Sequence, residues 1–164
     1  MPASSNNGSL PIEVRRSKIQ GRGVFATRRI RKGQRIVEYA GERVTPDEGE
    51  RRYVEGDMSR HHTFLFTLDE NTVIDGGRRG NISRFINHSC DPNAEAIIED
   101  DRIFIYAKRN IQPGTEILYD YQYERYPEHT KEDEDFYACR CGSASCRGTI
   151  LKAPKKKRAP RGAR

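Results

Sequence analysis

The chain has 164 residues, enough for one domain with a modest core, and 34% of them are hydrophobic while 33% are charged. The formal net charge is +6, and Trp is absent. This polar composition predicts a small, well-solvated domain and excludes a membrane-spanning protein, since no stretch approaches the roughly 20 apolar residues that a transmembrane helix needs.

Strand and turn signals alternate along the first half of the chain. Residues 1–10 are expected to be disordered, and their opening MPASSNNGS lacks the basic and apolar regions of a signal peptide. An extended segment begins at Ile12, and residues 29–39 are typical of two strands joined by a turn at Lys32-Gly33. Thr45 is expected to cap a helix that runs to about Glu55. Residues 63–75 have the pattern of a hairpin.

Short strands continue in the second half. Residues 81–86 predict a short helix or turn, residues 94–109 a hairpin turning at Asp100-Asp101, and residues 111–123 a turn followed by a strand through Tyr121. Two turn units are built alike, Ile30-x-x-Gly33 and Ile111-x-x-Gly114. Because strands dominate and no alternating βα pattern is present, the expected class is mainly β (α+β) with minor helices.

The four cysteines suggest a metal site. Cys90 lies in the turn-rich stretch RFINHSCDPN, and the other three form Cys139-x-Cys141-x4-Cys146. Four thiolates are what a closed, tetrahedral structural zinc site requires. Two disulfides or unrelated buried cysteines are the alternatives. We expect a soluble, intracellular protein, whose thiols stay reduced, and this favours zinc over disulfides. A zinc ion here would fasten the C-terminal segment to the turn that carries Asn87 and His88.

Basic residues are concentrated in the tail. Residues 152–164 carry seven Lys and Arg and no acidic residue, and without these seven charges the net charge is −1. We expect this tail to be disordered. It either contacts nucleic acid or simply solubilises the chain, since charge alone selects no partner. The nearly neutral remainder argues against a zinc-dependent DNA-binding protein, which needs a basic folded surface.

Five motifs in this order carry a family resemblance: GRG, EYAGE, RFINHSCDPN, YDY and CxCx4C. With them the chain closely resembles the SET-domain protein lysine methyltransferases, from about Ile12 to Leu151. The resemblance implies a SET domain over residues 11–126 and a post-SET zinc-binding segment over residues 127–151, without the cysteine-rich pre-SET region of many relatives. It also implies a fold of short β-sheets with a pseudoknot, in which the RFINHS and YDY strands pass through one another's loops.

The resemblance implies S-adenosylmethionine as the methyl donor. The residues that it assigns to donor binding are Gln20, Gly21, Arg22, Phe64, Arg84, Phe85, Asn87 and His88. Asn87 and His88 are expected to hold the amino group and the adenine edge of the donor, although ordinary turn residues are the alternative. Many relatives carry a tyrosine at the position of Phe64, so either the activity is weaker or Tyr39 and Tyr121 suffice without that hydroxyl.

Three tyrosines are candidates for the catalytic channel. Methyl transfer needs a neutral amine, whereas a free lysine with a pKa of about 10.4 is mostly charged at neutral pH. A narrow aromatic channel lowers that pKa by desolvation and still accepts a cation. Tyr119 and Tyr121 project from the same face of a strand. By resemblance Tyr121 is catalytic and Tyr39 lines the other side. The hydroxyl of Tyr119 disfavours a bulky amine, which predicts mono- or dimethylation. Strand packing is the alternative role of all three.

These observations lead to one expected function and one alternative. The first is a protein-lysine N-methyltransferase acting on a histone or histone-like protein, located in chromatin or, in a bacterium, in the cytoplasm. The second is a catalytically weak or inactive binding module that reaches nucleic acid through its tail. The acidic run at residues 132–135 is a candidate for contacting a basic substrate peptide. His61, His62 and His129 are expected to be solvated surface residues.

Overall fold

The computed structural model describes residues 9–53 and 63–154. Most of the two expected disordered ends, the end of the expected helix at Glu55, His61 and His62 lie outside these residues. The β-strands are β1 (Ile12–Arg16), β2 (Arg22–Ala26), β3 (Arg35–Glu38), β4 (Glu42–Val44), β5 (Leu65–Thr67), β6 (Val73–Asp75), β7 (Asn87–His88), β8 (Ala94–Glu99), β9 (Arg102–Ala107) and β10 (Glu116–Tyr119). The helices are α1 (Pro46–Arg51), the 3-10 helix η1 (Ile82–Phe85) and α2 (Lys131–Phe136).

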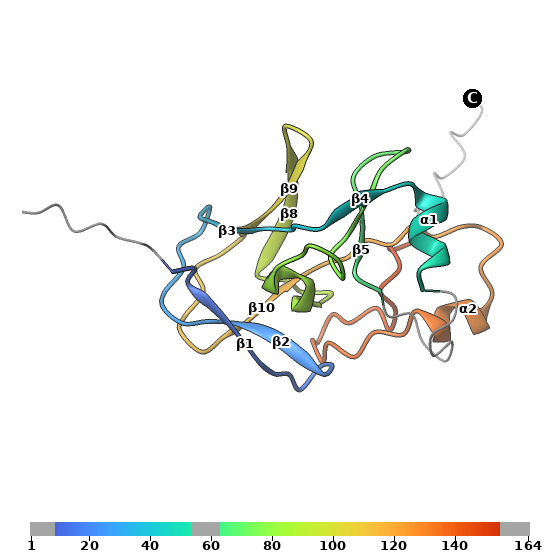
Figure 1. Ribbon diagram of the computed structural model, residues 1–164. Helices are drawn as coiled ribbons and strands as arrows, with labels where there is room; N and C mark the ends of the chain where they lie inside the picture. Colours follow the sequence, from blue (N-terminus) through green and yellow to red (C-terminus); the bar gives the residue numbers. More distant parts are fainter. Residues whose placement is uncertain (1–8, 54–62, 155–164) are drawn as a thin grey trace, which may run out of the picture.

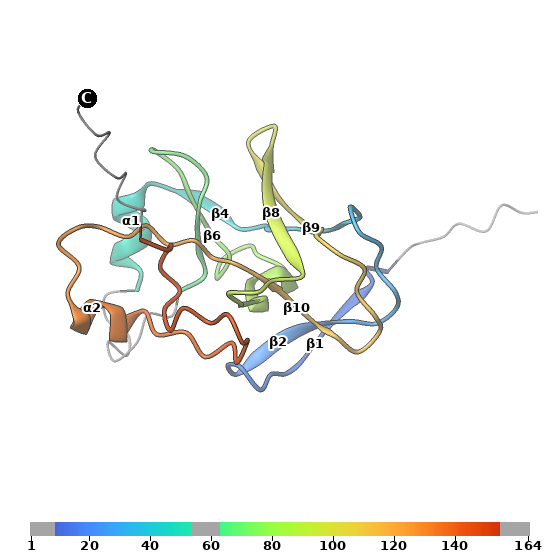
Figure 2. The ribbon, with the colours of Figure 1, turned by 180° about the vertical axis from the view of Figure 1, so that it is seen from behind.

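The strands form three small sheets around the middle of the molecule (Figures 1 and 2). Their strand orders are β1-β2-β10-β7, β3-β9-β8 and β4-β6-β5. Strands and short connections dominate, as the sequence predicts. Among the described residues no helix is long and apolar enough to cross a membrane.

The pairing of β7 with β10 brings the two most distinctive motifs together. These strands are parallel, with Leu118 opposite Asn87 and Tyr119 opposite His88. The Asn93 side chain fixes the loop after β7 to β10, since its amide donates to the Glu116 carbonyl and accepts from the Leu118 N–H, both at 2.9 Å. The RFINHSCDPN turn is therefore wrapped against the strand that leads into YDY.

The two turn units that look alike in sequence also pair in space. Ile30 and Ile111 form an isolated antiparallel bridge, and both side chains are buried at 0% and 2% exposure. Gly33 and Gly114 take φ values of 84° and 82°, a backbone conformation that favours glycine. The core around them is aliphatic, with Val24, Ile86, Ile105 and Ile117 almost fully buried.

Two local predictions need correction, and one helix was not predicted. Helix α1 ends at Arg51 rather than near Glu55; Arg52 is its C-cap, and the Arg52 side chain reaches carboxylates on β4 and β6. The strand expected through Tyr121 ends at Tyr119. The acidic run at 132–135 lies in α2, whose capping box joins Thr130 and Asp133. This capping box is visible in the sequence and signals the start of a helix. The sequence analysis missed it because it considered only the charge of the run.

Candidate active site and metal centre

The four cysteines gather into one cluster. Their Sγ atoms all lie within 4.8 Å of one another, and all four thiols are free. The Sγ atoms of Cys90 and Cys139 are 3.7 Å apart. Four sulfurs about 2.3 Å from a central zinc ion would be separated by about 3.8 Å, so the donor set fits tetrahedral zinc. Burial raises the pKa of the Cys90 and Cys139 thiols, so a cation is what would keep them as thiolates.

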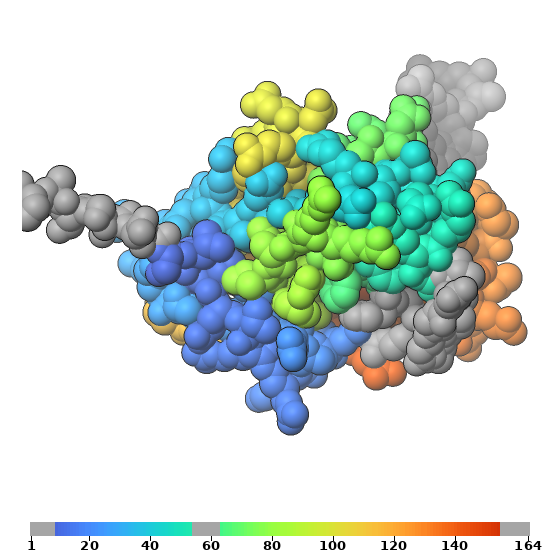
Figure 3. Space-filling model, in the orientation of Figure 1, coloured from blue at the N-terminus to red at the C-terminus, as the bar shows by residue number. Residues whose placement is uncertain are grey.

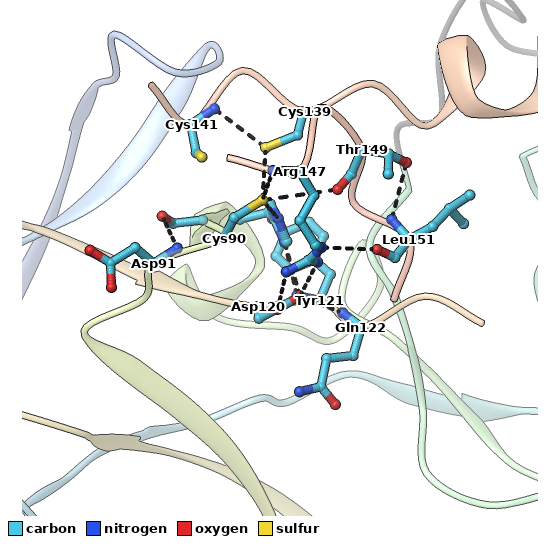
Figure 4. Close-up of polar contacts among 12 residues, drawn as sticks. Cys90, Asp91, Asp120, Tyr121, Gln122, Cys139, Cys141, Arg147, Thr149 and Leu151 are labelled. Atoms are coloured by element: carbon cyan, nitrogen blue, oxygen red, sulfur yellow. Dashed lines mark hydrogen bonds and ion pairs between the residues drawn. The ribbon is translucent and has the colours of Figure 1, made fainter. Parts of the chain in front are cut away.

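Arg147 connects this cluster to the segment after β10 that carries Tyr121 (Figure 4). Its guanidinium donates two hydrogen bonds to the Asp120 carboxylate, at 2.9 and 3.1 Å, and its backbone N–H lies 3.4 Å from Cys90 Sγ. The two side chains are only 23% and 18% exposed. Burial alone would raise the pKa of Asp120, but the Arg147 hydrogen bonds, together with the Gln122 backbone N–H and nearby positive charge, outweigh it and lower that pKa. The sequence offered no signal for this pair beyond the proximity of Arg147 to Cys146.

His88 links the same cluster to Tyr121. Its ring is buried, its Nδ1 accepts a 2.9 Å hydrogen bond from the Tyr121 backbone N–H, and its Nε2 lies 3.4 Å from Cys90 Sγ. Because Nδ1 accepts, the proton of the neutral ring is on Nε2 and points to the sulfur. Burial lowers the pKa of His88 to about 4, which is consistent with a neutral ring. Both ring nitrogens are therefore engaged within the protein.

A first hollow lies between the β1–β2 turn, η1 and the segment after α2. It is lined by seven of the eight residues assigned to donor binding, namely Gln20, Arg22, Phe64, Arg84, Phe85, Asn87 and His88. Gly21 is not part of the lining, but it turns the chain between two residues that are, with φ of 41°. The sequence analysis missed Ala138, Arg140 and Ile150, which line the hollow because the C-terminal segment folds back over it.

Asn87 holds the backbone of this hollow in place. Its amide nitrogen lies 3.2 Å from the Gln20 carbonyl, 3.0 Å from the Arg22 carbonyl and 3.0 Å from Glu116 Oε1. Glu116 also accepts from the Ser17 hydroxyl at 2.8 Å, and a Cβ at position 23 would collide with its carboxylate. The glycine of the GRG motif after Arg22 is thus required for close approach of β2 to β10.

The three candidate tyrosines lie in one aromatic cluster. The ring centroids of Tyr119 and Tyr121 are 4.9 Å apart, and Phe66 joins them to Tyr39 with centroid distances of 5.9 Å to Tyr119 and 5.2 Å to Tyr39. The Tyr39 hydroxyl donates to the Phe64 carbonyl at 2.6 Å, and the Tyr121 hydroxyl donates to the Ile86 carbonyl at 2.5 Å. Burial raises the pKa of all three phenols, so they are hydrogen-bond donors and not bases at neutral pH.

A second hollow meets the first at Tyr121. Tyr39, Tyr119 and Tyr121 all line it, together with Leu65 and Phe66 of β5 and Ala94 and Ala96 of β8. Thr63, Arg84 and Tyr121 line both hollows, so these three side chains form the partition between them. Glu95, Asp120 and Glu124 add carboxylates to the second hollow. The arrangement offers two binding sites whose contents would meet at the Tyr121 ring.

The acidic run at 132–135 does not line either hollow. Asp133 is used in the capping box of α2, and Glu134 forms an ion pair with Arg125. These carboxylates stabilise the local structure instead, so their suggested contact with a substrate peptide is not supported. His129 packs its ring edge-on against Tyr126 and accepts from its backbone N–H at 3.3 Å.

A comparison with protein families matches the SET-domain model to residues 21–122. The chain belongs to the SET-domain family. It is 44% identical over 147 residues to "Histone-lysine N-methyltransferase, H3 lysine-4 specific" of Emericella nidulans, a match that covers 85% of this chain and 12% of that protein. Identity is 40% over 152 residues to the protein of the same name from Saccharomyces cerevisiae, covering 88% and 14%. It is 42% over 146 residues to "Histone-lysine N-methyltransferase Set2" of Drosophila melanogaster, covering 85% and 6%.

The fold also matches a solved SET-family structure. The structure described as "ctPRC2 in an autoinhibited conformation bound to S-adenosylmethionine" is 34% identical, with a TM-score of 0.64, and the match covers 69% of this chain and 15% of that chain. The mainly β SET-domain fold expected from the sequence is therefore confirmed. This SET-domain chain spans only a small part of the length of the relatives that it matches.

Proposed function

We propose that this chain is the catalytic domain of a protein-lysine N-methyltransferase that uses S-adenosylmethionine. The observation that carries the proposal is the pair of hollows separated by Tyr121, one lined by the donor-binding motifs and the other by aromatic rings. The names of the curated relatives, and the S-adenosylmethionine bound to the related PRC2 structure, support it. The division into a SET domain over residues 11–126 and a post-SET segment over residues 127–151 is part of the proposal.

The first hollow is the proposed donor site. When bound, S-adenosylmethionine would supply a methyl group on a sulfonium, which is transferred in line to a nucleophile. Asn87 fixes the turn at residues 20–22 whose backbone would receive the donor, and the Phe64 and Phe85 rings, with centroids 6.0 Å apart, give its wall apolar faces. Donor access from solvent depends on the segment that the cysteines hold in place.

The second hollow is the proposed lysine channel. Its aromatic walls desolvate an incoming amine and lower the pKa of that amine, which favours the neutral nucleophile. The ring faces also attract the cationic form as it enters. Tyr121 reaches both hollows, and its protonated hydroxyl would orient the amine at a near-attack distance of about 3–3.5 Å.

Tyr119 is the proposed determinant of how many methyl groups are added. It is 6% exposed and lines the second hollow, and its hydroxyl has no hydrogen-bond partner among the residues of the two described segments. A hydroxyl without a protein partner is available to the amine or to a water molecule, and it occupies the space that a third methyl group needs. We therefore propose mono- or dimethylation.

One structural zinc ion, held by Cys90, Cys139, Cys141 and Cys146, is part of the proposed enzyme. Its chemical role would be to fix the C-terminal segment, because four thiolates leave no open coordination position for catalysis. Residues 138–140 and 150, which complete the wall of the first hollow, lie next to these ligands. Zinc binding and donor binding are coupled in this proposal.

The proposed substrate is a lysine in a histone tail, which would place the protein on chromatin. The names of the relatives support a histone, but relatives of nearly equal identity carry the names "H3 lysine-4 specific" and "Set2", so identity alone does not choose the lysine. Contact of the tail at residues 152–164 with nucleic acid belongs to the same proposal, and residues 155–164 lie outside the described part of the chain.

Transfer of labelled methyl groups tests the function. S-adenosylmethionine labelled in its methyl group is incubated with the chain and with core histones, and label on lysine is measured. Tyr121→Phe is expected to remove most of the label, because it deletes the hydroxyl between the two hollows. Tyr126→Phe is the matched control, since Tyr126 is 53% exposed and lines neither hollow. If a folded, zinc-loaded chain binds the donor but labels no protein, the inactive binding module replaces the enzyme.

A further inference from the structure

Positive charge in the folded part of the chain is concentrated at one margin. Residues 9–38 contain nine Lys and Arg but only two acidic residues. By contrast, residues 116–135 contain eight acidic residues and two basic ones. The nearly neutral sum of the folded part therefore hides two regions of opposite sign, and that sum does not by itself exclude a basic surface.

The basic residues follow the hairpin of β1 and β2. Strand β1 is the outer strand of its sheet, and Arg16 lies opposite Arg22 at one end of the hairpin, while Ile12 lies opposite Ala26 at the other. The five residues of β1 extend the hairpin over about 15 Å. Residues 28–32 continue the chain from the second end. Figures 1 and 2 show this hairpin along one margin, with its open end on the side of the molecule away from α2 and its turn beside the segment that follows α2.

We call this margin the basic edge. It is formed by the exposed side chains of Arg15, Arg16, Lys18, Arg22, Arg28, Arg29, Arg31 and Lys32. The same segment covers the lower left of the face seen in Figure 3. The Lys32 backbone N–H donates to Asn110 Oδ1 at 2.9 Å, which brings the exposed Lys108 and Arg109 beside it.

The basic edge differs from the rest of the surface in how its cations are paired. Of its eight cations only Arg15 forms an ion pair among the residues that the structure describes, and that pair is with Glu13. Elsewhere in the described part of the chain, eight of the fifteen Lys and Arg form ion pairs with carboxylates, among them Arg52 and Arg147, whereas Arg78 and Arg79 form none. Uncompensated charges of one sign along one margin create a field that attracts an extended polyanion.

We propose that the basic edge binds the phosphate backbone of duplex DNA. A duplex carries one charge per about 1.7 Å of its axis, so about 15 Å of hairpin lies beside roughly nine phosphates, a number comparable to the cations available. Of the large exposed hydrophobic residues among those described, Ile97, Ile98 and Tyr126 lie away from the edge and only Leu10 lies beside it, so the edge lacks the cluster of apolar residues that inserts into a lipid surface. Without an element shaped to enter a groove, contact is independent of DNA sequence.

DNA bound here leaves the proposed lysine channel accessible. The second hollow is lined mainly by β5, β8 and residues 119–124, and none of the eight residues of the basic edge lines it, although Lys108 beside the edge does. If the proposed function holds, DNA at the edge and a histone tail in the channel can be bound together, and Arg22, which also lines the first hollow, is shared between the DNA contact and the donor site. The DNA contact itself does not depend on methyl transfer, and it is distinct from any contact by the tail at residues 152–164.

Direct binding to DNA tests the basic edge. The full chain is titrated into a fluorescently labelled duplex of about 20 base pairs, without methyl donor, between about 50 and 200 mM salt. The edge variant is Arg29→Gln, Arg31→Gln and Lys32→Gln. The control variant, Arg51→Gln, Arg102→Gln and Lys131→Gln, removes the same charge from exposed positions outside the edge. Both variants keep the C-terminal tail, and equal thermal midpoints establish that both are folded.

The two variants separate the edge from a general charge effect. The edge variant is expected to raise Kd by tenfold or more and to reduce the slope of log K against log salt by about 1 for each phosphate that is no longer bound, while the control changes Kd by less than about twofold. If DNA binding weakens equally in both variants, or in neither, the proposal is overturned. Binding would then depend on the overall charge or on the tail at residues 152–164. Weaker binding to phosphatidylserine vesicles with unchanged DNA binding would overturn it in favour of a lipid surface.

Discussion

Removing the Arg147 guanidinium should destabilise the chain although Arg147 is outside both hollows. Its two hydrogen bonds to Asp120, at 2.9 and 3.1 Å, join groups that are 23% and 18% exposed. Arg147→Met keeps most of the aliphatic stem but leaves the Asp120 carboxylate largely desolvated and without its main partner. Two charge-assisted hydrogen bonds at this degree of burial predict a decrease of about 2–3 kcal/mol in the free energy of unfolding.

The assay is equilibrium unfolding in denaturant of the zinc-loaded chain. Arg102→Met is the matched control, since Arg102 makes the same two-pronged contact with Glu38, at 2.9 and 2.7 Å, but is 53% exposed. An exposed pair of this kind contributes less than about 1 kcal/mol. A double-mutant cycle of Arg147→Met with Asp120→Asn isolates the pair, with an expected coupling of at least about 1 kcal/mol.

One result would refute this reasoning. If Arg147→Met and Arg102→Met both changed the free energy of unfolding by less than about 0.5 kcal/mol, burial would not distinguish the two pairs. Arg147 would then be a screened surface residue, and the connection between the cysteine cluster and Tyr121 would depend on His88 alone. Zinc content measured on the same samples separates loss of the ion pair from loss of the metal.

Two further outcomes are expected. Tyr119→Phe should increase the number of methyl groups on the product lysine, seen as higher product masses in mass spectrometry of a histone peptide, because the hydroxyl that fills the channel is gone; an unchanged product distribution would contradict the role given to Tyr119. Chelation of zinc, or Cys90→Ser, should weaken donor binding tenfold or more in calorimetry and should expose residues 137–151 to proteolysis. The control Ser145→Ala, at an exposed position between two ligands, should change neither donor binding nor proteolysis. If the affinity for the donor is unchanged after complete removal of zinc, the proposed coupling between the zinc site and the donor site is wrong.

The sequence by itself determined the parts of this protein that depend on neighbours along the chain. The turns at Gly33 and Gly114 follow from residues that tolerate positive φ, and the cap of α1 at Thr45 from a side chain within reach of its own helix. The spacing of the cysteines indicated one four-ligand site, and the motif order indicated the SET family. α2 was also encoded locally, in the pair Thr130 and Asp133, and could have been predicted from it.

Only the tertiary structure decided which distant residues meet. Tyr121 touches both hollows because β7 and β10 pair in parallel across 31 positions, from Asn87 to Leu118, and no local pattern specifies that pairing. The ion pair between Asp120 and Arg147, and the hydrogen bonds from the Asn87 amide to backbone carbonyls, likewise join residues that are far apart in the sequence. Charge is the clearest case: the composition gives its sum, but folding places residues 15–32 along one margin of the molecule and α2 outside that margin. Long-range contacts depend on how the strands pack, and that packing is a property of the whole chain.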